Sequence, residues 1–231
     1  MPPSAEELVL RRYKREQITT QFRRGHLILC EGDADCNFLS HLLVDRKIFD
    51  FDLIIPDVEG GGVTAFDRCL KALTGATSFD DVIRGVVLVA DSNDDPGKRL
   101  DSLKKVFANN GLPSPEKPFK KIATEKIKTA IVMIPSATNP GNLESLLLEA
   151  AFDKHPEMNG CIEEFVKCSS LPLKWKPNQQ AKMKIHSLVA ARCEGDPSSS
   201  VAYLWGKKEN PVPIESKRFD FIADFLGSFT S

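Results

Sequence analysis

The stretch His26-Leu-Ile-Leu-Cys30, followed at once by Glu31-Gly32, decides the fold class of this chain. A short, nearly continuous apolar run that ends in a sharp turn is typical of a strand buried on both faces. Beyond the turn, apolar residues recur at helical spacing, at Phe38, Leu39, Leu42 and Leu43. The stretch therefore predicts a strand that enters a helix through a short acidic loop, which is half of a βαβ unit.

The same unit recurs three more times along the chain. Further strands are predicted at 53–55, 86–90 and 130–134, and the helices that follow them at 63–73, from after Asp95 to about residue 109, and from residue 143. Parallel strands need a crossover segment between them, usually a helix. Four consecutive strand–helix units therefore predict an α/β fold with a mainly parallel sheet flanked by helices.

The two ends of the chain differ from this central part. Residues 1–25 form a polar, basic N-terminal segment, and residues 26–155 contain the predicted α/β core. After about residue 155 the strand signals fade, and helices are predicted at 160–168, 178–193 and 216–226. We therefore expect residues 156–231 to form a helical C-terminal extension packed on the core.

The composition sets limits on the class of protein. With 42% hydrophobic and 27% charged residues in 231, the chain is neither disordered nor a coiled coil, and its net charge of −1 predicts no nucleic-acid partner by itself. The cysteines form no C-x-x-C pair, and no secretory leader or apolar run of about 20 residues is present. We expect a soluble, cytoplasmic protein with reduced thiols and no membrane partner.

Acidic residues follow the predicted strands. They are Glu31, Asp33 and Asp35 after the first strand, Asp57 and Glu59 after the second, Asp91, Asp94 and Asp95 after the third, and Glu144 at the start of the fourth helix. Ligands of open α/β sheets bind at the carboxyl ends of the strands, so these carboxylates converge if the strands are neighbours. Because like charges repel, the usual remedies are a bound divalent cation or raised pKa values. Oxygen ligands without His or Cys favour Mg²⁺ or Mn²⁺.

Helix capping is the alternative role for each single carboxylate. Asp and Glu after strands commonly cap the next helix, and Asp33 or Asp94 could do only that. Glu144 has its own alternative, because Asn142 can be the N-cap and an acid in the first turn complements the helix dipole. The metal hypothesis therefore depends on the whole set and not on any one residue.

Two basic stretches suit contacts with phosphate. Between Lys98 and Lys128 there are nine Lys or Arg against three acids, and Lys167–Lys184 contains five lysines and no acid. The candidate nucleic-acid contacts are Lys98, Arg99, Lys104, Lys105, Lys120, Lys121 and Lys184. Such contacts would give salt-sensitive affinity without sequence choice. The alternative is a solvated helix face, and Trp175 and Trp205 likewise either stack on bases or belong to the core.

Two segments carry a resemblance to a known family. Leu27–Asp35 (LILCEGDAD) and Val87–Asp94 (VLVADSND) resemble the Toprim fold of topoisomerases, primases and OLD-family (overcoming lysogenisation defect) nucleases. In that fold one apolar strand ends in Glu-Gly and another in Asp-x-Asp. The spacing of Glu31 and Asp35 is closest to the OLD-like branch, and further likeness lies in 134–144 and 180–186. Over about residues 26–228 the chain resembles compact, stand-alone OLD-like Toprim proteins with a Rossmann-like core.

The resemblance implies a divalent-metal site that hydrolyses phosphodiesters. Glu31 and Asp91 would bind one Mg²⁺ or Mn²⁺ ion, while Asp35 and Glu144 would help with a second. Two ions about 4 Å apart activate water and stabilise the leaving oxygen. A basic residue should neutralise charge on the phosphorus oxygens, and Lys182 is the nearest match by position, with Lys184 as the runner-up.

One position departs from the family pattern. Asn93 stands where the second acid of Asp-x-Asp is expected, and a neutral oxygen contributes less to holding a dication. Asp94 or Asp95 would substitute if the loop before Pro96-Gly97 redirects either side chain. Without such a substitute the site is weakened or degenerate.

The primary hypothesis is therefore a Toprim/OLD nuclease that cuts DNA or RNA, in a role that the resemblance places in antiviral defence. The chain has no G-x-x-x-x-G-K-[ST] loop, so any control by nucleotide requires a separate ATPase or sensor protein. A catalytically inactive nucleic-acid-binding or adaptor module is the alternative, motivated by Asn93. A phosphatase with Asp91 as nucleophile fits less well, because Asn93-Asp94 departs from that class. Endonuclease or exonuclease action and a homo-oligomeric state stay open.

Overall fold

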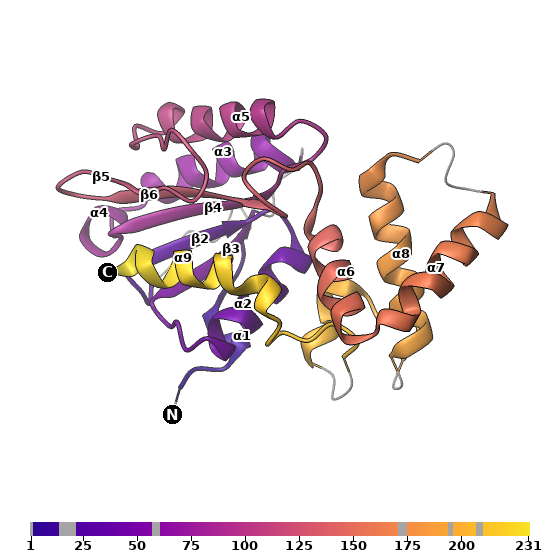
Figure 1. The fold of residues 1–231 in the computed structure, drawn as a ribbon. Coiled ribbons are helices and arrows are strands. Elements are labelled where there is room, and N and C mark those ends of the chain that lie inside the picture. Colours follow the sequence, from indigo (N-terminus) through magenta and orange to yellow (C-terminus); the bar gives the residue numbers. More distant parts are fainter. Residues whose placement is uncertain (1, 14–21, 57–60, 171–174, 194–195, 207–209) are drawn as a thin grey trace.

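The computed structural model describes residues 2–13, 22–56, 61–170, 175–193, 196–206 and 210–231. Its centre is a six-stranded sheet in the spatial order β1-β3-β2-β4-β6-β5 (Figure 1). The strands are β1 (Val9–Tyr13), β2 (His26–Cys30), β3 (Phe51–Pro56), β4 (Gly85–Asp91), β5 (Ile122–Ala123) and β6 (Lys128–Ile134). Every neighbouring pair is parallel except β5 with β6. The predicted α/β class with a mainly parallel sheet is therefore confirmed.

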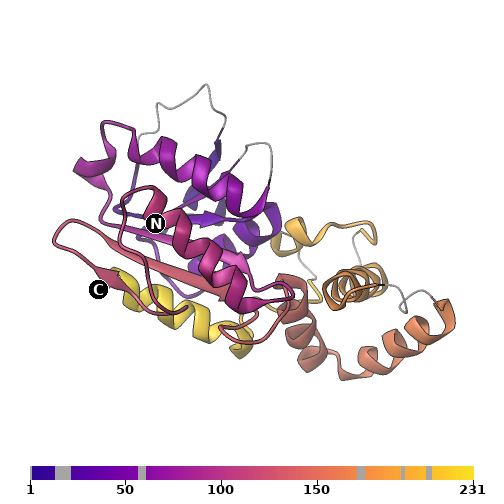
Figure 2. The same cartoon turned by 90° about the horizontal axis from the view of Figure 1, so that it is seen from above.

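Helices cover both faces of the sheet and extend beyond one end of it. One face carries α3 (Gly62–Thr74), α4 (Phe79–Val82) and α5 (Pro96–Asn109), and the other carries α1 (Ala5–Leu8), α2 (Asp33–Asp45) and α9 (Asp220–Thr230). Beyond the carboxyl ends of the strands lie α6 (Leu143–Lys154), α7 (Pro156–Ser169) and α8 (Pro177–Arg192). Two short 3-10 helices, η2 (Val201–Gly206) and η3 (Lys217–Phe219), lead back towards the sheet. Figure 2 shows α7 and α8 projecting from the core as a helical pair.

The strands are buried on both faces, which explains their nearly continuous apolar sequences. Val87 and Val89 pack into the cluster formed with α2, α6 and α9, whereas Val86 and Leu88 pack into the cluster formed with α3 and α5. Each of these four side chains is fully buried. Alternate residues of one strand thus stabilise two separate apolar layers, as expected for a parallel sheet with helices on both faces.

The connections define where a ligand can approach the sheet. The chain leaves β2 through α2 to reach β3 on one side, and it leaves β4 through α5 to reach β6 on the other side. Because β2 and β4 are neighbours, their crossovers depart in opposite directions, and the position between their carboxyl ends, which we call the crevice, is where ligands of open α/β sheets bind. Glu31 follows β2 directly, and Asp91 is the last residue of β4.

Several elements were not predicted from the sequence. Residues 9–13 of the basic N-terminal segment form the edge strand β1, paired with β3, although their two arginines interrupt the apolar pattern. The short α1, α4 and β5 were also missed, since four residues or fewer carry too little periodicity to recognise.

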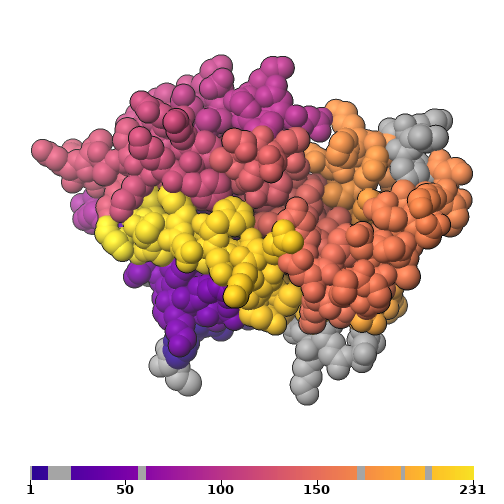
Figure 3. All heavy atoms as spheres, viewed as in Figure 1, coloured from indigo at the N-terminus to yellow at the C-terminus, as the bar shows by residue number. Residues whose placement is uncertain are grey.

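The C-terminal helix returns to the sheet. Figure 3 shows the last residues lying along the core beside N-terminal segments. Phe229 of α9 is fully buried, with its ring 6.1 Å from that of Phe51 in β3 and 5.8 Å from that of His26 in β2. A Cβ added at Gly85 would lie 2.6 Å from the Phe229 ring, so α9 and the start of β4 fit only with glycine there. The last turn of α9 therefore closes the amino end of the sheet.

This packing leads to a stability prediction. Phe229→Ala should lower the free energy of unfolding by about 3–5 kcal/mol, because it leaves a cavity among buried rings. The control is Phe221→Ala in the same helix, whose side chain is 38% exposed and whose loss should cost less than about 1.5 kcal/mol. Urea unfolding measures both values. Equal losses would show that α9 does not depend on this contact.

Candidate functional site

Glu31 and Asp91 meet at the crevice between β2 and β4. The Glu31 Oε2 atom accepts a hydrogen bond from the backbone N–H of Asp91 at 3.2 Å. The Asp91 side chain turns towards α6, where its Oδ1 accepts from the N–H of Leu143, the first residue of that helix, at 2.8 Å. The two acids predicted to lead the site are therefore brought together from strands whose sequences lie about sixty residues apart.

The loop after β4 holds Asp91 against the start of α6. Asn93 and Gly141 exchange two backbone hydrogen bonds, of 2.8 and 2.9 Å, and the N–H of Ser92 donates to the carbonyl of Ile134 at 2.7 Å. Gly141 has φ +148, and a Cβ there would lie 2.8 Å from the ring of Pro135. Only glycine fits this position, so a local backbone requirement helps to set the position of Asp91.

Asp35 and Glu144 complete a cluster of four carboxyl groups. Asp35 lies in the first turn of α2, is 8% exposed, and accepts from the N–H of Gly32 at 3.0 Å through Oδ2. Glu144 lies in the first turn of α6, where Asn142 is the N-cap, as the sequence allowed. We call Glu31, Asp35, Asp91 and Glu144 the acidic cluster.

Two members of the acidic cluster have raised pKa values. Burial raises the pKa of Asp35 well above its ordinary value, and the charges of Asp91, Glu31 and Glu144 raise it further. Burial, with the charges of Glu31 and Glu144, raises the pKa of Asp91 to about 7, against the lowering effect of the Leu143 N–H and of Lys182. Of the acids predicted to converge, these four thus act on one another's protonation.

Two cations balance part of this charge. Arg99 of α5 donates from Nη2 to Glu31 Oε2 at 2.6 Å and from Nε to the Asp91 carbonyl at 3.1 Å, and its side chain is only 11% exposed. Lys182 of α8 has its Nζ 3.8 Å from Glu144 Oε1 and is 57% exposed. Arg99 was a candidate for contacting nucleic acid at the surface, but its guanidinium instead points into the acidic cluster.

Asp94 and Asp95 have partners outside the acidic cluster. Asp95 is the N-cap of α5, where its Oδ1 accepts from the N–H of Lys98 at 3.0 Å, and Asp94 forms an ion pair of 3.0 Å with Lys176. The amide nitrogen of Asn93 lies 3.5 Å from the Asp91 carbonyl. Asp95 is therefore a helix cap, and neither Asp94 nor Asp95 supplies the second acid that Asn93 replaces. Asp57 and Glu59 lie outside the described residues.

The first basic stretch does not form one surface. Lys98 is 88% exposed beside Asp95, at the end of α5 nearest the crevice, while Lys104 and Lys105 lie further along the same helix. Lys121 donates to the carbonyl of Ser228 in α9 at 2.9 Å. Because α9 closes the amino end of the sheet, Lys121 and its neighbour Lys120 lie at the opposite end from Glu31.

The second basic stretch is divided between the two sides of α8. Lys182 faces Glu144 of α6, whereas Lys184 forms an ion pair with Glu163 of α7. Trp205 donates to the carbonyl of Val212 at 3.2 Å and packs 5.5 Å from the ring of Phe38, so it has a structural role. Trp175 is 36% exposed and stays available for contact with a ligand.

The donor chemistry of the acidic cluster suits a hard divalent ion, since every side-chain donor is a carboxylate oxygen. In the described parts of the chain, however, no group of three or more His, Cys, Asp or Glu residues is arranged to hold a metal ion. Oxygens of Glu31, Asp35 and Asp91 are directed instead at Arg99 or at backbone N–H groups. The donors fit such an ion in kind, and their side chains would have to turn in order to surround it.

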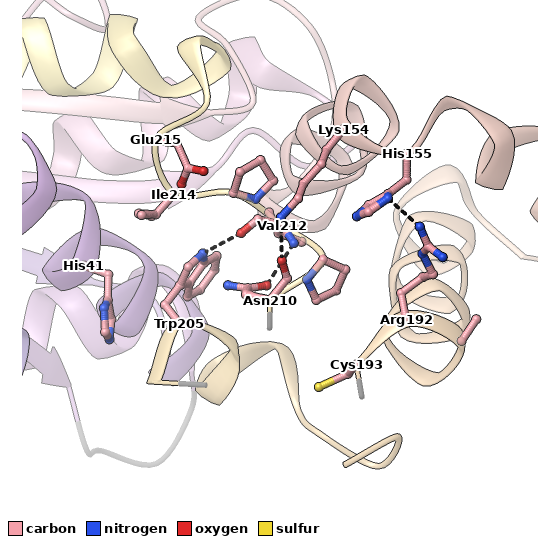
Figure 4. A pocket seen from close by; sticks show the side chains of 13 residues that line it. His41, Lys154, His155, Arg192, Cys193, Trp205, Asn210, Val212, Ile214 and Glu215 are labelled. Carbon is pink, nitrogen blue, oxygen red and sulfur yellow. Dashed lines mark hydrogen bonds between the residues drawn. The ribbon is translucent and has the colours of Figure 1, made fainter. Parts of the chain in front are cut away.

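A cavity of about 580 Å³ lies away from the acidic cluster, between η2, the end of α8 and the segment before η3 (Figure 4). His41, Trp205 and Arg192 are among the residues that line it. Trp205 donates to the backbone carbonyl of Val212, and Arg192 Nη2 lies 2.8 Å from His155 Nδ1. A smaller cavity of about 310 Å³ borders the site, between Asp94, Gly141 and Lys176. Neither cavity coincides with the acidic cluster, which among the described residues combines buried charge with the switch point of the sheet.

The fold and site define an α/β protein with a buried acidic cluster at the switch point of its sheet. A family model described as Protein of unknown function (DUF3226) matches residues 25–226, so the chain belongs to the DUF3226 family. No curated protein and no solved structure matches the chain. Among the described residues, no helix has both the length and the apolar character needed to cross a bilayer.

The acidic cluster predicts an unusual dependence of stability on pH. The pKa of Asp91 is about 7 in the folded protein and about 3.9 in an unfolded chain, so the folded state binds more protons between these values. Stability should therefore fall as pH rises from about 4 to 7, and Asp35 acts in the same direction. Urea unfolding in EDTA should give a lower free energy at pH 8 than at pH 5.5.

Asp91→Asn should reduce this difference, because the asparagine does not titrate. The control is Asp80→Asn, which removes an exposed acid at the start of α4 and should keep the wild-type dependence. An unchanged pH dependence in Asp91→Asn would contradict the electrostatic coupling described above.

Proposed function

We propose that this protein is a divalent-metal-dependent nuclease that hydrolyses phosphodiester bonds of DNA or RNA. The observation that carries the proposal is the contact between Glu31 and Asp91 within the acidic cluster, at the position where open α/β sheets bind ligands. The resemblance of 27–35 and 87–94 to Toprim/OLD nucleases supports the same conclusion independently of the packing.

In this proposal Glu31 and Asp91 hold one Mg²⁺ or Mn²⁺ ion, and Asp35 and Glu144 help with a second. The ions would lower the pKa of bound water and stabilise charge on the leaving oxygen. The chain's own contribution is placement, because the Leu143 N–H fixes Asp91 and the Gly32 N–H fixes Asp35. These bonds keep two of the acids beside the switch point of the sheet, and their carboxylates would turn from the N–H groups to surround an ion.

Lys182 is the residue best placed to meet the phosphate. It reaches the rim of the acidic cluster from α8 and is more than half exposed, so it can contact a ligand from the solvent side. Its runner-up, Lys184, is engaged with Glu163 and is 21% exposed. A compact ammonium at this point would offset charge that develops on the phosphorus oxygens.

The partners belong to the proposal as well. Lys98, Lys176 and Lys182 are exposed cations near the crevice, and they are the contacts through which we expect a nucleic-acid backbone to bind. A role in antiviral defence, a separate ATPase or sensor and a cytoplasmic location rest on the family resemblance and on the scattered free cysteines.

A second candidate function is a nucleic-acid-binding or adaptor module without cleavage. Asn93 in place of the expected acid favours it, and so does the absence of a metal-holding group in the described geometry. This candidate predicts salt-sensitive binding that does not depend on Glu31.

Cleavage assays separate the two candidates. Purified protein with Mg²⁺ or Mn²⁺ should cut plasmid, linear DNA or structured RNA, and Glu31→Gln or Asp91→Asn should each lower the rate at least about 100-fold, since each removes a charged ligand. Asp95→Asn should keep activity, because asparagine caps a helix as well as aspartate does. Binding without metal-dependent cleavage would favour the adaptor. Cleavage that survives EDTA would contradict a metal-dependent nuclease.

Lys182 can be tested on its own. Lys182→Met should lower kcat by about 10²-fold while leaving the affinity for Mn²⁺ within about threefold, because the ammonium would act on the phosphate rather than on the ion. Lys184→Met, two residues away on the other side of α8, is the matched control and should change kcat little. An equal effect of both substitutions would contradict the assignment of Lys182.

A further inference from the structure

Arg99 is a largely buried cation that bridges the two central strands. Its Nη2 lies 2.6 Å from Glu31 Oε2, after β2, and its Nε lies 3.1 Å from the Asp91 carbonyl, at the end of β4. Its side chain is 11% exposed and that of Glu31 is 25% exposed. A charge-assisted hydrogen bond in such a partly dry position is stronger than the same contact on an open surface.

The partner of Arg99 is the carboxylate that is proposed to hold the metal. An oxygen that accepts a hydrogen bond from a guanidinium at this distance already has its negative charge compensated. A divalent ion on the same oxygen would in addition face the positive charge of Arg99 at close range. The other nearby cation, Lys182, lies 3.8 Å from Glu144 and is mostly exposed, so it can move aside easily.

A glycine lies beside this ion pair. Gly62 lies at the start of α3, and a Cβ built there would lie 3.6 Å from Glu31 Oε1 and 3.9 Å from Arg99 Nη1. A larger residue would therefore touch both partners. With glycine, no side chain from this position holds the guanidinium in place.

We propose that Arg99 is a resident counterion that competes with the divalent ion for Glu31. The inference rests on the proposed function, and it adds a mode of regulation to that site. Without metal, Arg99 holds Glu31 and compensates part of the charge of the acidic cluster. When an ion binds, Arg99 releases Glu31. The observed affinity for the ion is therefore the intrinsic affinity multiplied by the fraction of molecules in which the Arg99–Glu31 pair is open. The competition also explains why carboxylates that suit a divalent ion are not arranged to hold one among the described residues.

Metal titration tests the competition directly. Isothermal calorimetry with Mn²⁺ should show that Arg99→Gln binds at least about tenfold more tightly than the wild type, because no charge-assisted hydrogen bond has to be broken. The matched control is Arg218→Gln, which removes the same charge from an arginine that binds Asp153 and Glu149 on α6 at 2.7 and 3.0 Å. Its Mn²⁺ affinity should stay within about twofold of the wild type. An affinity of Arg99→Gln that is unchanged or weaker would overturn the proposal.

A second measurement separates failure of this inference from failure of the proposed function. A double-mutant cycle of Arg99→Gln and Glu31→Gln, followed by urea unfolding in EDTA, should show coupling between the two residues, and saturating Mn²⁺ should abolish it. Absence of coupling in EDTA would overturn the inference even if metal binds. Coupling in EDTA, with no Glu31-dependent Mn²⁺ binding by either the wild type or Arg99→Gln, would refute the metal site itself and make Arg99 a permanent structural counterion.

Discussion

The candidate site depends on two crossover helices that leave neighbouring strands in opposite directions. Because α2 and α5 leave β2 and β4 towards different edges of the sheet, neither of these two crossovers lies between the carboxyl ends of the two strands, and the start of α6 borders this position instead. Glu31 and Asp91 stand at this position, and the first turns of α2 and α6 add Asp35 and Glu144. The topology thus concentrates acids that a simple hydrophobic core would exclude.

Backbone N–H groups and cations offset part of the repulsion within the acidic cluster. Backbone N–H groups of Gly32 and Leu143 bind one oxygen each of Asp35 and Asp91, and Arg99 binds Glu31. Burial, and after it the charges of the neighbouring carboxylates, still raises the pKa values of Asp35 and Asp91, so these groups favour a bound proton. A site that stays electrostatically unsatisfied after folding is suited to a cationic ligand, whereas a fully paired network would serve stability alone.

The geometry of α8 shows how one helix serves two neighbours. Lys182 and Lys184 are two residues apart, so their side chains point to well-separated sides of the helix. Lys182 consequently reaches Glu144 on α6, and Lys184 reaches Glu163 on α7. Lys184 therefore links α8 to α7, and Lys182 faces the crevice. Through Lys182 the C-terminal helices take a direct part in the candidate site.

Local patterns in the sequence were enough to determine the four strand–helix units, the α/β class and the presence of Glu31 and Asp91 at strand ends, because burial periodicity and turns act over a few residues. Tertiary structure alone decided which long side chains meet. Arg99 lies 68 positions from Glu31, and only the adjacency of β2 and β4 turns it from a surface cation into the partner of that acid. The same holds for Asp95, which the start of α5 uses as a cap, and for Lys121, which the return of α9 places at the far end of the sheet. A flexible side chain takes its direction from neighbours that are distant in sequence, and no local pattern encodes them.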